Sequence, residues 1–525
     1  MRLRGPSDRW ILGCALAAFT VVAGLESLSG LSTRDEAWFL QVVARVASGD
    51  VLYRDIFFGA TPLSVWVTLP FVALVGVQLA LVKLVVVGAF AATLLLVVWT
   101  ARLLGAGTLT GVVLAAAMLV FAPLPRVGLY QPLATVFLLA CLAAALAWQV
   151  RLGEREPDPR RERWLILAAG AAAGLAFSSK QNIGLYALAA LLGAVVLGAA
   201  GQRLRSSVVA LGGFAACALL PLVPVAITGG LDRFAEYGLS NKGTYVERGG
   251  VSYFRGLLGS IGNARDRATA GEGWRDAVYS VLPAQQVLLF LLVPTVLVLL
   301  AFVWLRSAGA ERRRAGVVGL FLLAAVAALY PLADGAHVRF VAPVILLAAW
   351  FALDGLAGGI SGRGRRLAAI AIAVVLVPGA AVRTAWPVLR VVDQDARPST
   401  LPHARWILIE PERELLIRRT GRSLARQATR GTVFLATPEA GFYYLESGVD
   451  NSTPYDYPLV TAFGRTGEAE LAAEIERGEV DAVCMRYHVR PERIPWQLVA
   501  AVQTSMDGRR YLPACRIYRW PALGP

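Results

Sequence analysis

The sequence is short of charged residues, which make up 17% of its 525 residues, against about 25% in an ordinary soluble protein. Hydrophobic residues make up 57%, and the mean hydropathy is +0.58. This composition excludes an intrinsically disordered chain and argues against a wholly soluble one. Apolar runs close to 20 residues long predict a polytopic membrane protein instead.

Acidic residues are scarcer than basic ones, 36 against 51, which gives a formal net charge of +15. Such an excess can indicate a nucleic-acid or anionic-lipid partner, so its distribution matters. Six Arg-rich segments hold 18 arginines and 6 acids, and therefore +12 of the total. They are residues 2–9, 102, 151–163, 203–205, 306–314 and 363–366. By the positive-inside rule they are predicted to be cytoplasmic, so the charge describes orientation and no nucleic-acid partner is predicted.

Eleven apolar runs are predicted to cross the membrane. They are residues 10–28, 82–100, 108–124, 132–150, 164–177, 183–200, 207–228, 285–304, 316–332, 338–356 and 367–387. Residues 62–76, about 15 residues interrupted by Pro70, are too short for a span and are predicted to form an interfacial or re-entrant helix. The N-terminal run resembles a signal peptide but lacks a convincing cleavage site, so an uncleaved anchor is expected.

This count predicts a membrane domain over residues 1–387 with a cytoplasmic N-terminus. Its external parts include a first loop at 29–61 and a long loop at 229–283, where one or two interfacial helices are expected. Residues 388–525 carry 18 basic and 17 acidic residues and are predicted to form a small, soluble α/β domain on the external side. Its expected strands are 432–436, 442–445, 480–485 and 515–518, and its expected helix is 468–477. Cys484 and Cys515 fall in two of these strands, and a disulfide between them stays open.

Several motifs of soluble enzymes are missing. The sequence has no phosphate-binding P-loop, zinc spacing, HExxH or GxSxG motif with triad partners. The Asp393-Gln394-Asp395 string has the spacing of a nucleotide-sugar metal motif, but no nucleotide-binding pattern accompanies it. It is predicted to be a solvated linker, and no metal ligands are assigned.

The first external loop carries the densest group of polar residues. Asp35 and Glu36 precede an amphipathic stretch at 37–47, and Tyr53-Arg54-Asp55 follows before Thr61-Pro62-Leu63. On residue type alone, Asp35 is a helix N-cap and Glu36 lies in the first helical turn.

The loop resembles the first external loop of the GT-C membrane glycosyltransferases. The similarity is closest to bacterial relatives of the protein O-mannosyltransferases and the lipid A aminoarabinose transferase. It rests on Asp35-Glu36, on Trp38-Phe39, on the string from Tyr53 to Phe58, and on a glycine-rich run at 174–182 that contains Lys180. The layout of the whole membrane half, and the tail in outline, resemble the family too.

The resemblance implies a GT-C-like fold and a hexosyl- or pentosyltransferase of the inverting type in the plasma (inner) membrane of a bacterial envelope. Its donor would be a polyprenyl-phosphate sugar, and its acceptor a glycan, lipid or protein hydroxyl on the outer face. Asp35 matches the catalytic acidic position and would act as general base, with Glu36 as a neighbouring or capping residue. The leaving phosphate needs a cation, and the chain has only three lysines, at 83, 180 and 242. Lys180 fits best, with an interfacial anchor as the alternative.

Five further residues are expected to bind substrate. Arg54 would meet phosphate or pair with Asp55 or Asp50, and His337 and Arg339 form a polar turn before a late span or anchor it at the interface. Gln131 stands where relatives often carry an acid, which puts metal dependence in doubt. No cofactor is assigned, and a divalent cation stays open.

The rival interpretation is a transporter or flippase for a lipid-linked glycan. Such a protein should carry charged or Gly/Pro-broken segments at mid-span, paired between two halves. Here the polar residues collect at the outer ends of the spans, which favours chemistry at the interface.

Overall fold

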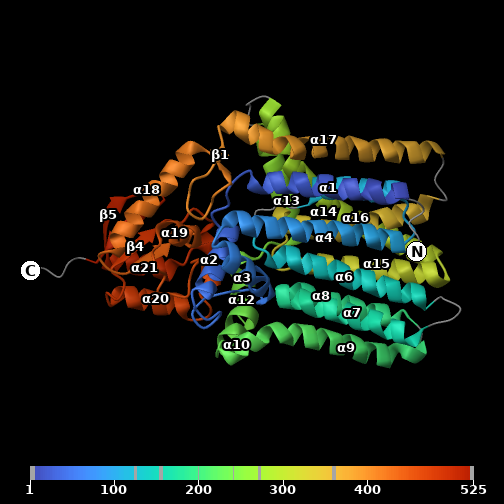
Figure 1. Ribbon diagram of the computed structural model, residues 1–525, viewed down its shortest axis with the longest axis horizontal. Coiled ribbons are helices and arrows are strands. Elements are labelled where there is room, and N and C mark those ends of the chain that lie inside the picture. Colours follow the sequence, from blue (N-terminus) through green and yellow to red (C-terminus); the bar gives the residue numbers. More distant parts are fainter. Residues whose placement is uncertain are drawn as a thin grey trace, which may run out of the picture.

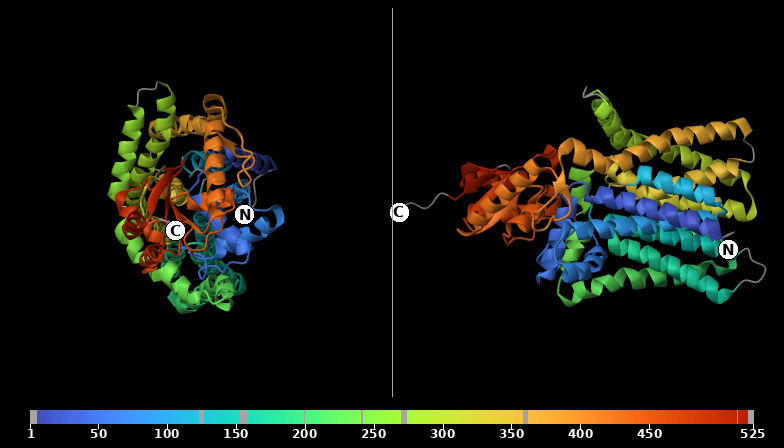
Figure 2. Two further views of the ribbon diagram at one scale, coloured as in Figure 1. Left: turned by 90° about the vertical axis from the view of Figure 1, so that its left-hand side faces the viewer. Right: turned by 45° about the horizontal axis from the view of Figure 1, so that its top comes forward.

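The computed structural model describes residues 6–122, 127–152, 158–198, 200–240, 242–269, 274–357, 362–512 and 514–520. Parts of the Arg-rich segments, at residues 2–5 and 153–157, lie outside these ranges. A bundle of long helices forms most of the molecule, and strands and shorter helices of the C-terminal region cover one end of it (Figures 1 and 2).

Eleven helices run along the bundle (Figure 1). They are α1 (Pro6–Leu28), α4 (Leu79–Leu103), α5 (Thr108–Phe121), α6 (Tyr130–Arg151), α7 (Pro159–Ser179), α8 (Gln181–Val196), α9 (Arg203–Leu219), α14 (Trp274–Arg306), α15 (Gly309–Ala327), α16 (Gly335–Ala357) and α17 (Gly362–Gln394). Such apolar segments adopt helices because a helix satisfies every backbone polar group internally.

Seven candidate spans within the described residues are long and apolar enough to cross a membrane. They are Asp8–Leu28, Leu79–Leu103, Tyr130–Arg151, Arg203–Ile227, Pro283–Arg306, Gly335–Leu356 and Ile370–Gln394. The other four predicted spans correspond to α5, α7, α8 and α15, which are shorter or more polar and pack in the same bundle. A polytopic helical fold is therefore observed, and the total of eleven crossings stays a prediction.

Two short helices, one in the first loop and one directly after it, lie between the bundle and the C-terminal region (Figure 1). Helix α2 (Asp35–Ala47) buries Phe39, Leu40 and Val43, while α3 (Leu63–Val75) has 13 residues and leaves Leu74 83% exposed. A helix of 13 residues rises about 20 Å, less than the hydrocarbon core. This length agrees with the interfacial prediction for residues 62–76.

The segment after α9 contains the helices expected in the long loop. It holds η2 (Leu220–Leu222), α10 (Val223–Ile227), α11 (Leu231–Phe234), a π-helical turn (Ala235–Ser240), α12 (Lys242–Gly249) and α13 (Tyr253–Ala268). Helix α13 packs along α14 and leaves Phe254 and Leu258 exposed.

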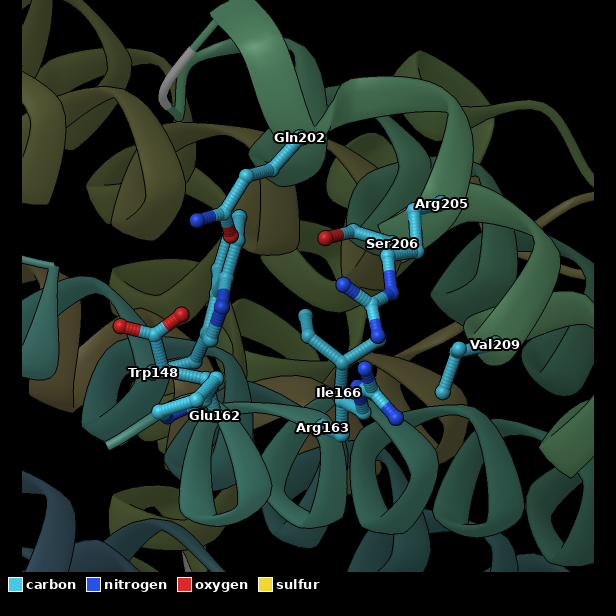
Figure 3. Close-up of a pocket in the computed structure, with 9 residues that line it drawn as sticks. Trp148, Glu162, Arg163, Ile166, Gln202, Arg205, Ser206 and Val209 are labelled. Atoms are coloured by element: carbon cyan, nitrogen blue, oxygen red, sulfur yellow. The ribbon is translucent and has the colours of Figure 1, made fainter. Parts of the chain in front are cut away.

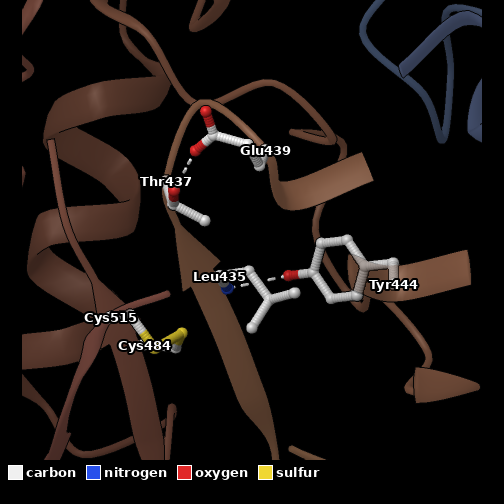
Figure 4. Close-up of a disulfide and its surroundings, with 6 residues drawn as sticks. All are labelled: Leu435, Thr437, Glu439, Tyr444, Cys484 and Cys515. Carbon is white, nitrogen blue, oxygen red and sulfur yellow. Dashed lines mark hydrogen bonds between the residues drawn. A yellow bond between two sulfur atoms is a disulfide. The ribbon is translucent and has the colours of Figure 1, made fainter. Parts of the chain in front are cut away.

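The C-terminal region combines a sheet of order β3-β4-β6-β5 with helices. The strands are β3 (Val433–Ala436), β4 (Ala482–Met485), β5 (Asp507–Tyr511) and β6 (Arg516–Arg519); β3 and β4 are parallel, and the other pairs are antiparallel. The helices are α18 (Pro411–Ala428), α19 (Ala440–Ser447), α20 (Gly467–Glu476) and α21 (Trp496–Ser505), and a two-stranded ladder joins β1 (Arg397–Pro398) to β2 (Leu408–Ile409). Cys484 and Cys515 form a disulfide with a Cα–Cα distance of 5.5 Å (Figure 4), which resolves the alternative left open above.

Three of the four expected strands and the expected helix correspond to β3, β4, β6 and α20. The strand expected at 442–445 is wrong, because these residues belong to α19, which Gly448 ends with a φ of 65°. A short apolar run does not distinguish a strand from a buried helix. Helix α17 also runs unbroken across the expected domain boundary at 387/388 and ends at Gln394.

Candidate active site

Asp35 is the first residue of α2, and its side chain is exposed to solvent although protein surrounds it. Burial by that protein raises the pKa of the carboxyl above its ordinary value, while the charges of His337 and Arg34 act in the opposite direction. A solvent-accessible carboxyl within a protein recess suits a base that must meet a substrate.

Glu36 has a different environment. Its side chain is fully buried, with Oε2 at 2.7 Å from Lys83 Nζ and Oε1 accepting the Ser32 N–H at 2.8 Å. Both oxygens are engaged in the protein, so the contacts favour the structural role among the two expected for Glu36. Lys83, which α4 contributes, is its buried partner.

The Tyr53-Arg54-Asp55 string forms a closed turn. Arg54 Nε and Nη2 each donate to Asp55 at 2.9 Å, and Asp55 accepts the Val51 N–H at 2.8 Å. The hydrogen bonds from Arg54 are the main reason why the pKa of Asp55 lies below its ordinary value. Tyr53, at a φ of 71°, donates its hydroxyl to the Ala60 carbonyl. Of the two alternatives for Arg54, the structure has the ion pair with Asp55.

Lys180 and Gln131 meet although 49 positions separate them in the chain. Lys180 stands in extended conformation between α7 and α8, and its ammonium donates to Gln131 Oε1 at the start of α6. Gln181 fixes the turn because its Nε2 donates to the Gly238 carbonyl at 2.6 Å. Two residues expected separately to bind substrate therefore form one polar group.

His337 and Arg339, which the sequence places together, lie in different surroundings. His337 Nδ1 is 2.8 Å from Asp334 Oδ1, and its charge acts on Asp35. Arg339 is only 4% exposed and donates to the carbonyl of Ala122 and to Gln285. Arg383 donates to the same Ala122 carbonyl and pairs with buried Glu26. His337 thus belongs with Asp35, whereas Arg339 belongs to a buried cluster that joins α1, α14, α16 and α17.

A cavity of about 790 Å³ lies next to this group. Its walls come from α12, α13, the start of α16 and the turn at 490–493, and Asp334 is among the lining residues. The charged residues on the walls are Arg248, Arg255, Arg490, Arg493, Glu247, Asp334 and Glu492. Arg493 on the cavity wall also acts electrostatically on Asp35, although Asp35 itself is not among the lining residues. The volume lies in the range of small-molecule sites.

Sequence reasoning missed the arginines of the C-terminal region that line the cavity. Arg490 and Arg493 flank Pro491-Glu492 in a short 3₁₀ turn that resembles any solvated loop. Nothing in the local pattern marks them, because only tertiary packing brings the turn to α12 and α13.

A second, much smaller cavity lies at the other end of the bundle, between α6, α7 and α9 (Figure 3). Trp148, Glu162, Arg163 and Arg205 are among its lining residues, and its volume is about 40 Å³. Such a space holds one or a few waters and no sugar ring. The larger cavity is therefore the candidate substrate site.

The C-terminal region contacts the start of α2 through charged groups. Arg34 Nε donates to Glu439 Oε1 at 3.0 Å, and His488 Nε2 lies 2.9 Å from the same oxygen. In the last turn of α2, Arg45 pairs with buried Asp456 at 3.1 Å. These contacts fix the C-terminal region against the loop that carries Asp35.

Comparison with known proteins gives a family match and a fold match. Residues 60–227 match the family described as dolichyl-phosphate-mannose-protein mannosyltransferase. ArnT from Cupriavidus metallidurans, solved with bound undecaprenyl phosphate, superposes with a TM-score of 0.54 at 15% identity over 98% of each chain. The archaeal oligosaccharyltransferase AglB from Archaeoglobus fulgidus, solved with an inhibitory peptide and a dolichol-phosphate, gives 0.54 at 11% identity over 97% of this chain and 74% of that chain. No curated protein matches the chain.

Proposed function

Because the chain has the fold of the GT-C membrane glycosyltransferases, we propose that it transfers a sugar from a polyprenyl-phosphate donor to an acceptor hydroxyl, with Asp35 as general base. The observation that carries the proposal is an exposed Asp35 on which Arg493 acts electrostatically, since Arg493 is one of four arginines on the walls of the 790 Å³ cavity. The solved relatives support the donor class, since ArnT holds undecaprenyl phosphate and AglB a dolichol-phosphate.

The reaction is a single displacement at the anomeric carbon. The acceptor oxygen forms a bond to that carbon as Asp35 takes its proton, and the bond from the carbon to the phosphate oxygen breaks. The polyprenyl phosphate leaves with the bonding electron pair. One displacement inverts the anomeric configuration, and the sugar transferred is a hexose or pentose.

Basic side chains stabilise the leaving phosphate. Arg248, Arg255 and Arg493 line the cavity, and a guanidinium binds phosphate oxygens in a bidentate manner. The Lys180–Gln131 pair supplies a second polar contact for the donor. His337 contributes another positive charge near Asp35 when it is protonated.

No step of this mechanism is assigned to a metal ion. Within the described ranges, no three His, Cys, Asp or Glu side chains cluster as candidate ligands. Asp395 of the DxD string pairs with Arg397 at 2.8 Å, and Gln131 donates or accepts as a neutral amide.

We place the reaction on the outer face of the plasma membrane. The N-terminal end of α1 and the C-terminal strands lie at opposite ends of the bundle (Figure 1), as an odd number of crossings requires. Eleven spans with the arginine-rich ends inside would leave loop 29–61 and an α/β domain at 388–525 outside. The Cys484–Cys515 disulfide suits the oxidising external compartment. The acceptor, whether glycan, lipid or protein, is therefore an envelope component.

Replacing Asp35 by Asn tests the base assignment. We expect sugar transfer to fall by about 10²- to 10⁴-fold, because the amide cannot take the acceptor proton. The measurement uses the purified protein in lipid nanodiscs with a panel of radiolabelled polyprenyl-phosphate hexoses and pentoses. A deletion strain complemented with each variant supplies the acceptor side through the sugar content of its envelope glycans.

The matched control is Asp232→Asn, which changes an exposed carboxylate of α11 outside the cavity. It should keep the parental rate. Activity of the parent should also fall as the pH drops through the raised pKa of Asp35, since the protonated acid is no longer a base. Parental transfer by Asp35→Asn would refute the proposal.

A further inference from the structure

The two basic side chains that act most strongly on Asp35, those of His337 and Arg34, each contact another carboxylate. Arg34 donates through Nε to Glu439 Oε1 at 3.0 Å, and His337 Nδ1 lies 2.8 Å from Asp334 Oδ1. In the part of the chain that the structure describes, the Asp35 carboxylate itself has no hydrogen bond or ion pair. The carboxylate oxygens of Asp35 are therefore available to a substrate, although several basic side chains act on it electrostatically.

Glu439 is well fixed for holding Arg34. Thr437 Oγ1 donates to Glu439 Oε2 at 2.8 Å (Figure 4), and His488 Nε2 contacts Oε1 at 2.9 Å. The Glu439 side chain is only 12% exposed. Thr437 and Glu439 follow β3, and His488 follows β4, so the carboxyl ends of two parallel strands build the group.

Arg34 is the residue directly before Asp35, and its side chain is 41% exposed. A guanidinium that is not held elsewhere pairs readily with a carboxylate so close in the chain. Such a cation lowers the pKa of the carboxylate and occupies its lone pairs, which weakens it as a base. The position of Arg34 therefore controls the basicity of Asp35.

We propose that Glu439 is a positioning residue for Asp35: by holding Arg34, it keeps the Asp35 carboxylate unpaired and open to the acceptor hydroxyl. The placement of Arg34 stands on the contacts alone, and its consequence for catalysis rests on the proposed function. The C-terminal region then takes part in the reaction without touching the reacting atoms.

Other charged groups act on Asp35 or lie on the side of Glu439, and the test changes none of them. Arg493 and Asp334 act on Asp35 from the 490–493 turn and the start of α16. Glu439 acts electrostatically on Tyr443, as do Arg413 and Arg486.

The experiment measures the protonation of Asp35 without any substrate. Carbodiimide with a glycine amide labels protonated, accessible carboxyls of the nanodisc-embedded protein, and mass spectrometry reads the peptide that contains Asp35. Glu36 is fully buried and paired with Lys83, so it serves as an unlabelled internal reference. The labelled fraction against pH gives a midpoint for Asp35.

In Glu439→Gln, the midpoint should move to lower pH by about one unit, because the released Arg34 approaches Asp35. In Arg34→Gln, it should move to higher pH, because a cation is lost. The double variant should match Arg34→Gln, since Glu439 acts only through Arg34. Arg34→Gln leaves Glu439 intact and keeps the test valid if Glu439→Gln fails to fold.

The variant His488→Asn distinguishes a positioning role of Glu439 from a general destabilisation of the contact between Glu439 and the start of α2. It removes the imidazole that contacts Glu439 and leaves Arg34 in place, so the midpoint should stay at the parental value even if the melting temperature falls. An unchanged midpoint in folded Glu439→Gln, or additive shifts in the double variant, overturns the inference. If the midpoints shift as expected but Asp35→Asn still transfers sugar, the proposed function fails and the placement of Arg34 stands.

Discussion

Asp35 and Glu36 are consecutive in the chain, but their side chains lie in different environments. Successive residues of a helix point in different directions, so the first carboxyl faces solvent in its recess and the second lies fully buried against Lys83. The Asp-Glu string alone could not assign the two roles, because it does not show which side of α2 packs against α4. The buried pair instead explains why a chain with only three lysines carries one inside a helix bundle.

The Glu36–Lys83 pair leads to a prediction about stability. Lys83→Met removes one partner of a buried pair and should destabilise the protein by about 3–5 kcal/mol, since it leaves an uncompensated charge. The double variant Glu36→Gln/Lys83→Met carries no charge at either of these two positions and should recover most of that loss. Thermal unfolding followed by intrinsic fluorescence in detergent compares the two. Equal melting temperatures for the single and double variants would contradict a role for charge burial.

The sequence proposed candidate residues but not the contacts between them. Of its candidates, the structure brings Lys180 into contact with Gln131, and His337 acts electrostatically on Asp35. Glu439 was beyond sequence reasoning because its contact with Arg34 joins residues 405 positions apart. Long-range pairs of this kind leave no local pattern.

At the scale of elements, composition predicts the long helices and says little about how closely they approach. Helices α7 and α9 pack through glycines: a Cβ at Gly170 would overlap the Ala210 carbonyl, and one at Gly213 would lie 2.5 Å from the Leu167 carbonyl. Small residues let helix backbones approach in membranes, where the hydrophobic effect does not drive association. Helix α19, which replaces the strand expected at 442–445, also approaches α2 closely: a Cβ at Gly441 would lie 2.9 Å from Trp38 Cα.

Gly170→Ala should therefore separate α7 from α9 and destabilise the bundle by about 1–3 kcal/mol through overpacking. Gly212→Ala is the matched control on α9, because a Cβ there meets nothing within 4 Å. We expect its melting temperature to equal or slightly exceed that of the parent, as alanine has the higher helix propensity. The comparison needs only thermal unfolding of the three proteins in one detergent. A loss as large in Gly212→Ala would show that close approach is not the cause.

At the scale of the molecule, the membrane half and the C-terminal region are joined through the first loop. Arg45 of α2 reaches Asp456 and the Thr453 carbonyl, and the Phe57 N–H donates to the Pro454 carbonyl at 2.8 Å. The sequence predicted a separate domain beginning at 388, but its balanced charge could not reveal that α17 runs on to Gln394 or that the region binds the loop. The large cavity depends on this union, since residues of α12, α13 and the 490–493 turn all line it.

The orientation of the whole molecule provides the last prediction. Arg465 near the start of α20 and Arg160 at the start of α7 are both exposed. Helix α20 lies at the end of the bundle opposite the N-terminal end of α1 (Figure 1), and Arg160 belongs to a segment predicted to be cytoplasmic. Each is changed to Cys in a background where Cys14, Cys141 and Cys217 are Ser and the Cys484–Cys515 disulfide is kept. A membrane-impermeant maleimide on intact cells should label Arg465→Cys and spare Arg160→Cys, because arginine-rich ends stay in the cytoplasm. After lysis both should react, which shows that each thiol is accessible. The reverse pattern in intact cells would place Asp35 on the cytoplasmic face and contradict transfer to an envelope acceptor, and labelling of both would contradict a bundle that crosses the membrane.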